Sequence, residues 1–254
     1  DQMPYRQALK KAQQLGFAEA NPTLDVNGTD TVHKLSILAS LALGSWVAPR
    51  QIYREGIENL DIADMLFARK NLGLSLKLLG IFEAPQNNQI SARVHPCLIN
   101  ASHPLATVND EYNAIWLKTD AAGDLYFQGK GAGALPAASA VVSDLVDLAQ
   151  MILAKTTASQ INHPTASVTI MPIKRCLSSY YLRFLAKDQP GVLAKIADSI
   201  GKNGISIAQI YQGTIPGLAR QQGRAPIVVI THPGPEEAIQ KTLRILHGNK
   251  NEAN

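Results

Sequence analysis

The sequence has few cysteines, few aromatic residues and no long run of uncharged apolar residues. Only Cys97 and Cys176 carry thiols, and no further ligands complete a zinc-site spacing around His95 and Cys97. We therefore expect no metal site, and two isolated thiols indicate a reducing, cytoplasmic compartment. The best candidate for a membrane helix, residues 35–49, contains three serines and is shorter than the ~18–20 residues of a span. No signal peptide is visible.

Charge of one sign is also scarce. The formal net charge is +4 at pH 7, and the basic residues form no tract with interleaved aromatics. This pattern argues against a nucleic-acid-binding protein. The composition, 46% hydrophobic and 17% charged, argues against disorder and fits a globular protein with a sizeable core. A length of 254 residues suffices for one large domain or two small ones.

Hydrophobic periodicity predicts an α+β fold, with a mixed β-sheet and helices on one face in the first part. The predicted helices are residues 3–15, 31–43, 58–70 and 136–155, and the predicted strands are 74–82, 90–98, 114–118 and 125–128. Gly123 is expected to take a positive φ in the turn between the last two strands. Thr29 or Asp30 is the expected N-cap of helix 31–43. Apolar groups surround that helix, so we expect it to be buried on most sides.

A second part is predicted near the C-terminus. Residues 156–174 are rich in Thr, Ser, Pro and Asn, which is typical of a linker. We therefore place a first domain at 1–155, a linker at 156–177 and a second domain at 178–254. The second domain has the order β-α-β-β-α, most of a ferredoxin-like βαββαβ unit. Its expected last strand is not visible in residues 247–254.

Three carboxylates and a lysine gather around the start of helix 31–43. Glu19, Asp25 and Asp30 precede or open it, and Lys34 follows Asp30 by four residues, on the same helix face. One interpretation is a surface ion pair beside an N-cap, with a contribution of only ~0.3–0.5 kcal/mol. The alternative follows from the missing polar face: a partly desolvated lysine held by carboxylates can donate a proton to a developing alkoxide. Glu19 and Asp30 could also bind a substrate ammonium.

The same segment resembles the substrate-site signature of homoserine dehydrogenases. The resemblance rests on Gly-Phe-Ala-Glu-Ala-Asn-Pro, Asp-Val-Asn-Gly-Thr-Asp and His-Lys-Leu, and further segments at 52–57, 74–80 and 131–145 occur in the family's order. It implies that Lys34 exchanges the proton with the substrate oxygen and that Glu19 and Asp30 hold homoserine, with Asp25 in support. It also implies that Gly16 and the loop containing Gly131 and Gly133 approach the nicotinamide.

The family's reaction is the reversible conversion of homoserine and aspartate 4-semialdehyde, with NADP or NAD as the cofactor, in threonine, methionine and isoleucine biosynthesis. The family's nucleotide-binding domain would precede residue 1, and the sequence contains no strand, Gly-rich turn and helix of that kind. We therefore expect the cofactor to be bound mainly by residues outside this sequence, and the chain alone to be inactive. The resemblance also implies a homodimer in which the sheets of two subunits join.

The C-terminal part resembles an ACT domain, an amino-acid-sensing module. The likeness rests on Asp188-Gln-Pro-Gly-Val-Leu193 between a strand and a helix. A glycine there lets the amides of the helix start point at a ligand carboxylate. The resemblance implies feedback by an amino acid, usually threonine, and the candidate contacts are Asp188, Gly191, Val192 and Gln209. The alternative is that Asp188 only caps the helix and Gln209 is a solvated strand residue.

Two other functional hypotheses stay open at this point. The chain could be a stand-alone amino-acid-binding regulatory protein without catalysis, or a structural oligomerisation module. Neither needs a lysine in an apolar helix beside an acidic loop. The combination of Glu19, Asp30 and Lys34 therefore favours the enzyme.

Overall fold

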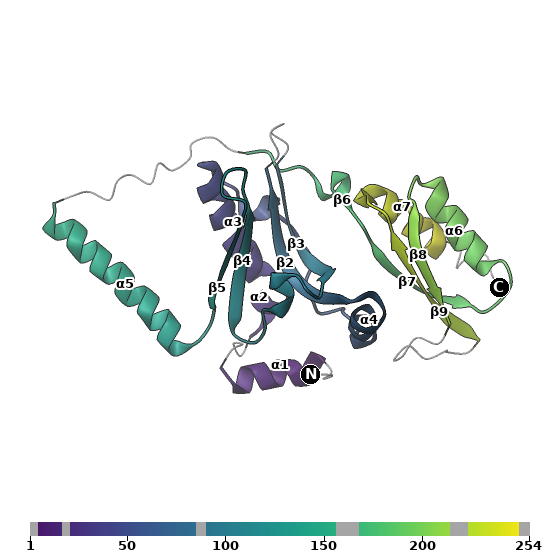
Figure 1. Cartoon of the computed structure of the whole chain (residues 1–254), viewed down its shortest axis with the longest axis horizontal. Helices are drawn as coiled ribbons and strands as arrows, with labels where there is room; N and C mark the ends of the chain where they lie inside the picture. The colour runs from purple at the N-terminus through teal and green to yellow at the C-terminus, as the bar shows by residue number, and fades with distance from the viewer. Residues whose placement is uncertain (1–4, 17–20, 85–89, 156–167, 214–222, 249–254) are drawn as a thin grey trace. The chain divides into compact units, whose positions relative to one another are not determined.

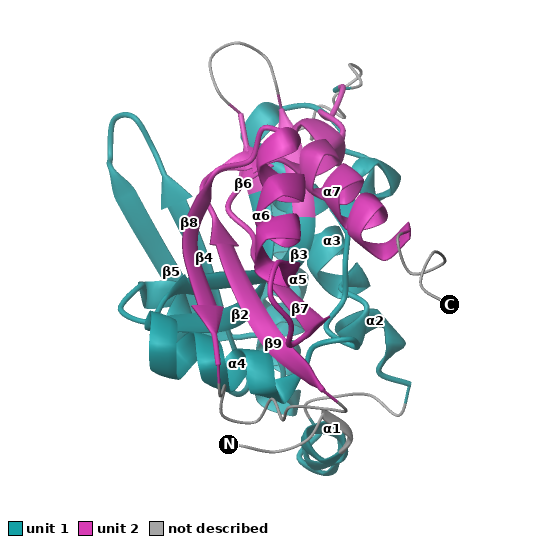
Figure 2. Cartoon of the chain, turned by 90° about the vertical axis from the view of Figure 1, so that its right-hand side faces the viewer, with its two compact units in different colours: residues 1–81, 94–168 teal, residues 82–93, 169–254 magenta. Residues whose placement is uncertain are grey.

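The computed structural model describes residues 5–16, 21–84, 90–155, 168–213 and 223–248 (Figure 1). It divides into two compact units (Figure 2). The first contains residues 1–81 and 94–168, and the second contains 82–93 and 169–254. Helices and strands are mixed in the chain and the strands form several small sheets, which confirms the predicted α+β class.

The part of the chain before residue 156 contains the helices and strands that the periodicity predicted there. Its helices are α1 (Tyr5–Gln14), α2 (Thr23–Val26), α3 (Thr29–Leu43), α4 (Ile62–Phe67) and α5 (Ala134–Leu153). A π-helical turn, Ala68–Leu72, continues α4. Asp61 caps α4 because its side chain accepts a hydrogen bond from the Ala63 amide at 2.9 Å. The short helix α2 lies where the sequence predicted only a loop, whereas the four longer predictions are confirmed.

The strands of the first part form a three-stranded sheet and a separate hairpin. The sheet has the order β1-β3-β2, made of β1 (Tyr53–Arg54), β2 (Leu74–Glu83) and β3 (Ser91–Asn100). The hairpin pairs β4 (Tyr112–Lys118) with β5 (Asp124–Lys130) antiparallel. Gly123 has a φ of +70° in the turn, as predicted.

The predicted N-cap of α3 is wrong. The cap is Gly28, with a φ of +80° in the left-handed region, and not Thr29 or Asp30. Asn27 supplies the side-chain acceptor instead, since its Oδ1 accepts from the Thr29 amide at 2.9 Å. The chain therefore enters the helix through a conformation that favours glycine, and the capping role falls to the residue before it.

The predicted burial of α3 on most sides is also wrong. Val32, Leu35, Ser36 and Ala39 are buried, which is one stripe of the helix. The other side exposes large side chains, up to 70% for Leu41. The described residues of this chain cover only one side of α3, so the apolar residues on its other sides stay exposed.

Helix α5 has no buried residue. Its exposed large apolar side chains are Leu135, Val141, Val142, Leu145, Val146, Leu148, Ile152 and Leu153. By length and composition alone it could cross a membrane. It also carries Asp144 and Asp147, and one such helix is weak evidence for a span. Exposed apolar surface of this extent is typical of a face that packs against another part of a protein.

The second unit has the predicted strand and helix order. It contains β6 (Leu177–Ser178), β7 (Tyr181–Lys187), α6 (Val192–Lys202), β8 (Ile207–Gln212), β9 (Arg224–Thr231), β10 (Gly234–Pro235) and α7 (Glu236–Gly248). The main sheet is antiparallel in the order β7-β9-β8. Its core combines strand and helix residues, among them Ile200, Ile227, Val229 and Ile239. No strand follows α7 within the described residues, which end at 248.

Candidate functional site

The predicted pair of Asp30 and Lys34 forms at the start of α3. Asp30 Oδ2 lies 2.7 Å from Lys34 Nζ. The side chains are 44% and 51% exposed, respectively. The lysine is therefore paired as predicted, but it is not desolvated by the described residues. About half of the Lys34 side-chain surface is therefore open to solvent.

A tight backbone junction holds the segment that carries these two residues. A Cβ on Gly56 would lie 2.4 Å from the Val26 carbonyl oxygen and 2.7 Å from Asn27 Cα, so only glycine fits without a backbone shift. The Ile57 amide donates to the same Val26 oxygen at 2.8 Å. Arg54 donates from its guanidinium to the Thr29 hydroxyl. The segment after β1 thus fixes where α2 ends and α3 begins.

Asn113 on β4 is a member of this site that the sequence analysis missed. With the amide turned so that its oxygen and its nitrogen both have partners, Oδ1 accepts from Lys34 Nζ at 3.2 Å. Nδ2 then donates to the backbone carbonyl oxygen of Tyr112 at 3.3 Å. Asn113 is 79 positions beyond Lys34 in the sequence. No local pattern links two residues so far apart, so only the fold could reveal the contact.

The other predicted substrate and cofactor residues come from several segments of the chain. Glu19 lies outside the described residues. Asp25 is exposed on α2, and its backbone oxygen accepts from the Gly28 amide. Gly16 follows α1 with a φ of +74°, and Gly133 caps α5 with a φ of +120°. Gly131 lies against the Asn113 side chain.

Lys77 on β2 anchors the segment that leads into β4. Its Nζ donates to the Val108 carbonyl oxygen and, at 3.1 Å, to Asn109 Oδ1. Burial and then the nearby Arg69 lower the pKa of Lys77. A lysine tied to a backbone carbonyl has a structural role, and here it fixes the chain just before Asn113.

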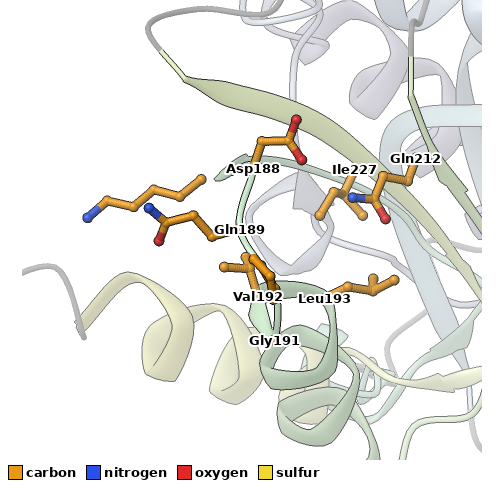
Figure 3. A pocket seen from close by; sticks show the side chains of 9 residues that line it. Asp188, Gln189, Gly191, Val192, Leu193, Gln212 and Ile227 are labelled. Carbon is orange, nitrogen blue, oxygen red and sulfur yellow. The ribbon is translucent and has the colours of Figure 1, made fainter.

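A second candidate site lies at the start of α6 in the C-terminal unit. A cleft of about 390 Å³ is lined by three of the four predicted contacts, Asp188, Gly191 and Val192 (Figure 3). Gly191 has a φ of +84° and precedes the first turn of the helix. Gln209 does not line the cleft; its Oε1 accepts from the Tyr211 hydroxyl at 2.8 Å.

Gln212 lines this cleft in place of Gln209. Gln212 on β8 pairs with Ile227 on β9. Ile227 packs in the core with helix residues and also lines the cleft, whereas Gln209 pairs with Ile230. Side chains alternate along a strand, so residues an odd number of positions apart point to opposite faces. Applied to β8, that rule could have selected Gln212 from the sequence.

A buried polar cluster lies elsewhere in the second unit. Arg93 Nη1 lies 2.7 Å from Glu83 Oε2 and 2.9 Å from the Ser91 hydroxyl. Burial opposes ionisation of Glu83, but the hydrogen bonds from Arg93 and Ser91 outweigh it and lower the pKa of this carboxyl. Burial raises the pKa of the Cys176 thiol, and the nearby Arg93 lowers it by a smaller amount, so that the pKa stays raised. The described residues contain no group of three potential metal ligands, and this cluster is a structural one.

Comparisons with known proteins identify the family. A family profile described as homoserine dehydrogenase matches residues 1–146, more than half of the chain. The chain belongs to the homoserine dehydrogenase family. An ACT domain profile matches residues 180–248. The homoserine dehydrogenase of Neisseria gonorrhoeae is 40% identical over 246 residues, which cover 94% of this chain and 55% of that protein. The Pseudomonas aeruginosa enzyme is also 40% identical, with the same coverage.

Solved structures of homoserine dehydrogenases agree with this assignment. The one from Thiobacillus denitrificans has a TM-score of 0.85 at 35% identity and covers 98% of this chain and 56% of its own. The S. aureus enzyme at pH 7.5 has a TM-score of 0.67 at 30% identity, covering 94% and 56%. The chain thus spans about half the length of the homoserine dehydrogenases that it matches.

Proposed function

We propose that this chain is the substrate-binding and regulatory part of a homoserine dehydrogenase that interconverts homoserine and aspartate 4-semialdehyde with NADP or NAD. The observation that carries the proposal is the ion pair of Asp30 and Lys34, at the start of a helix inside the matched region. A stand-alone amino-acid sensor is the weaker alternative, because it would give this pair no task.

In the proposed reaction, Lys34 exchanges the proton with the substrate oxygen. An ammonium has three N–H donors, and Asp30 occupies one of them, so others can point at a hydroxyl or carbonyl. Asp30 and Glu19 hold the substrate ammonium, with Asp25 in support. The cofactor supplies only the hydride step.

The described residues fit one end of the cofactor. A Cβ on Gly16 would meet no atom within 4 Å, and one on Gly133 would meet only Pro136, so the backbone of both is open to a flat ring. The β4–β5 hairpin and the β7-β9-β8 sheet pair antiparallel, so neither contains a parallel strand–helix–strand unit. A dinucleotide needs such a unit for its phosphates. We therefore assign the phosphates to a part of the enzyme outside this sequence.

The catalytic proposal is tested in the intact enzyme, with its nucleotide-binding part present. Replacing Lys34 by Met should lower kcat by about 10²–10⁴, the usual loss when a general acid is removed. The matched control is Lys118→Met, a lysine on the hairpin outside the site. Wild-type turnover of homoserine that survives Lys34→Met would refute the role of the lysine, and absence of wild-type turnover would refute the reaction.

We also propose that the cleft at the start of α6 binds threonine as a feedback effector. The amides around Gly191 suit a carboxylate, and Asp188 suits an ammonium. Calorimetry of the whole chain with threonine tests this, with Val192→Asp as the blocked variant and Gln209→Ala as the control. Binding heat from the wild type and from Gln209→Ala, but not from Val192→Asp, supports the site. No heat at millimolar threonine counts against it.

The remaining proposals concern organisation. We propose a homodimer in the cytoplasm, supported by the apolar surface of the β4–β5 hairpin and by the family assignment. We keep 1–155, 156–177 and 178–254 as the catalytic domain, linker and regulatory domain. The two profile matches lie within the first and last of these ranges.

A further inference from the structure

We propose that Asn113 is a positioning residue for Lys34, and that position 131 is a glycine because the Asn113 amide fills the space of its side chain. This inference rests on the dehydrogenase function proposed above. It assigns Gly131 a task that differs from direct contact with the cofactor.

The ammonium of Lys34 is held from two elements. Asp30 Oδ2 lies 2.7 Å away on the same helix, and Asn113 Oδ1 lies 3.2 Å away on β4. The other amide group of Asn113 donates to the Tyr112 oxygen, which fixes the side chain's direction. One N–H of the lysine remains for a substrate oxygen.

A second acceptor matters because a free lysine has many rotamers. Its side chain has high rotamer entropy, and a half-exposed ion pair alone orders it poorly. A neutral amide fixes the direction of the ammonium without adding a second negative charge. The arrangement thus orients the proton donor and leaves the charge balance of the site to the carboxylates.

Gly131 leaves room for this amide. In the turned orientation of the amide, a Cβ at this position would lie 2.0 Å from Asn113 Oδ1, the atom that accepts from Lys34, and 2.4 Å from Asn113 Cγ. Gly131 is absent from the glycines with a positive φ, so its backbone would accept any residue. Its amide donates to the Glu111 oxygen at 2.8 Å, which keeps the loop in place. Side-chain volume is therefore what is excluded, and the Asn113 amide would have to swing away.

The test compares Asn113→Ala, Gly131→Ala and the double variant in the intact enzyme. Loss of orientation should lower kcat about tenfold for each single variant, with KM for homoserine changed by less than about twofold. Because Gly131 acts through Asn113, the double variant should be no slower than Asn113→Ala. Gln128→Ala, another amide on this hairpin, is the control and should keep the wild-type kcat.

Two results would overturn the proposal. If Gly131→Ala lowered kcat by the same factor in the wild type and in the Asn113→Ala variant, the glycine would act independently of Asn113, as expected of a residue that faces the cofactor. An Asn113→Ala enzyme with wild-type kcat, even if its thermal midpoint falls, would mean that the amide is only structural.

A readout without catalysis separates this inference from the reaction itself. In ¹⁵N NMR of the chain, the side-chain amide signal of Asn113 should shift in Lys34→Met and in Gly131→Ala, but not in Lys118→Met. Absence of the first two shifts overturns the contact, whatever the enzyme turns over. A missing wild-type activity together with both shifts would refute the reaction and leave the contact standing.

Discussion

At the scale of single residues, serine hydroxyls hold the C-terminal end of α3. Ser36 donates to the Val47 oxygen, while Ser40 accepts from the Val47 amide at 2.9 Å and donates to the Ser36 oxygen at 2.7 Å. Ser36 is 1% exposed and Val47 is fully buried. These bonds fold the chain back after the helix and satisfy polar groups that water cannot reach.

Ser36→Ala should therefore destabilise the chain. It leaves the Val47 oxygen buried without this donor, which costs about 1–3 kcal/mol. Urea denaturation measures the change. Ser143→Ala, an exposed serine on α5, is the control and should stay within about 0.5 kcal/mol of the wild type. Equal stability of both variants would show that Val47 finds another donor.

The Glu83 carboxyl gives a prediction about pH. Its folded pKa lies below the usual value of 4.5, so its contribution to stability is fully present above that value. The contribution is lost as the pH falls through the folded pKa. Glu83→Gln should cost about 1 kcal/mol at pH 7, a modest loss because the carboxylate is partly exposed.

The pH dependence separates this effect from a packing defect. The difference in unfolding free energy between wild type and Glu83→Gln should shrink as the pH falls below 4.5. Denaturant titrations at several pH values measure it. Asp198→Asn, in an exposed pair with Lys202, is the control. A difference that stays constant with pH would contradict the role of the Glu83 charge.

Residue-level features divide into those that the sequence could predict and those it could not. The four-residue spacing of Asp30 and Lys34 is local, and the pair forms as predicted. The contact of Lys34 with Asn113 depends on how a distant hairpin meets the helix, so no periodicity encodes it. The cap at Gly28 depends on a positive φ, and the neighbouring Thr29 and Asp30, which are common N-cap residues, led to the wrong prediction.

At the scale of elements, periodicity predicted the helices and strands well because the spacing of apolar residues reflects the backbone geometry of each element. It failed for the environment of α3, and both α3 and α5 carry more apolar residues than the described chain covers. Burial depends on partners, and a helix pattern cannot tell a partner within the chain from one outside it. The same limit explains why Lys34 is half-exposed although its helix looks buried in the sequence.

The junction of α2 and α3 gives an element-scale prediction. Gly56→Ala would press a Cβ against the Val26 oxygen and the Asn27 backbone, which must shift. Overpacking of this kind costs about 1–3 kcal/mol, and the shift should also raise KM for homoserine in the intact enzyme because Asp30 moves with its helix. Thermal denaturation and steady-state kinetics measure both effects.

Gly201→Ala is the matched control for Gly56→Ala. Gly201 lies in α6 with nothing within 4 Å of a new Cβ. A helical glycine in open space should gain about 0.5–1 kcal/mol on replacement by alanine. If Gly56→Ala were as stable and as active as Gly201→Ala, the junction would not fix the start of α3.

At the scale of the whole molecule, we expect the chain alone to lack dehydrogenase activity. Assayed alone, the 254 residues should show no NADPH-dependent turnover, because we assign the dinucleotide phosphates to a part of the enzyme outside them. The measurement follows absorbance of the reduced cofactor with aspartate 4-semialdehyde. The intact enzyme is the positive control. Turnover by the chain alone would show that it binds the whole cofactor by itself.

Assembly gives the last whole-molecule prediction. One face of the hairpin joins Ile115 to Phe127 and Leu117 to Leu125 across the two strands, and Ile115, Leu117 and Phe127 are 37%, 43% and 55% exposed. An antiparallel hairpin with an exposed apolar face is a suitable surface for a second copy. Phe127→Asp would place a charge at its centre and should convert a dimer into a monomer.

Light scattering after size exclusion measures this change, and Lys118→Asp is the control because Lys118 lies on the opposite face of the hairpin. The control should keep the dimer mass, since it introduces the same residue, an aspartate, without touching the apolar face. A Phe127→Asp chain that stays dimeric would move the interface elsewhere, with the uncovered side of α5 as the next surface to probe by Leu145→Asp. A wild-type chain that is monomeric at micromolar concentration would contradict the hairpin interface directly.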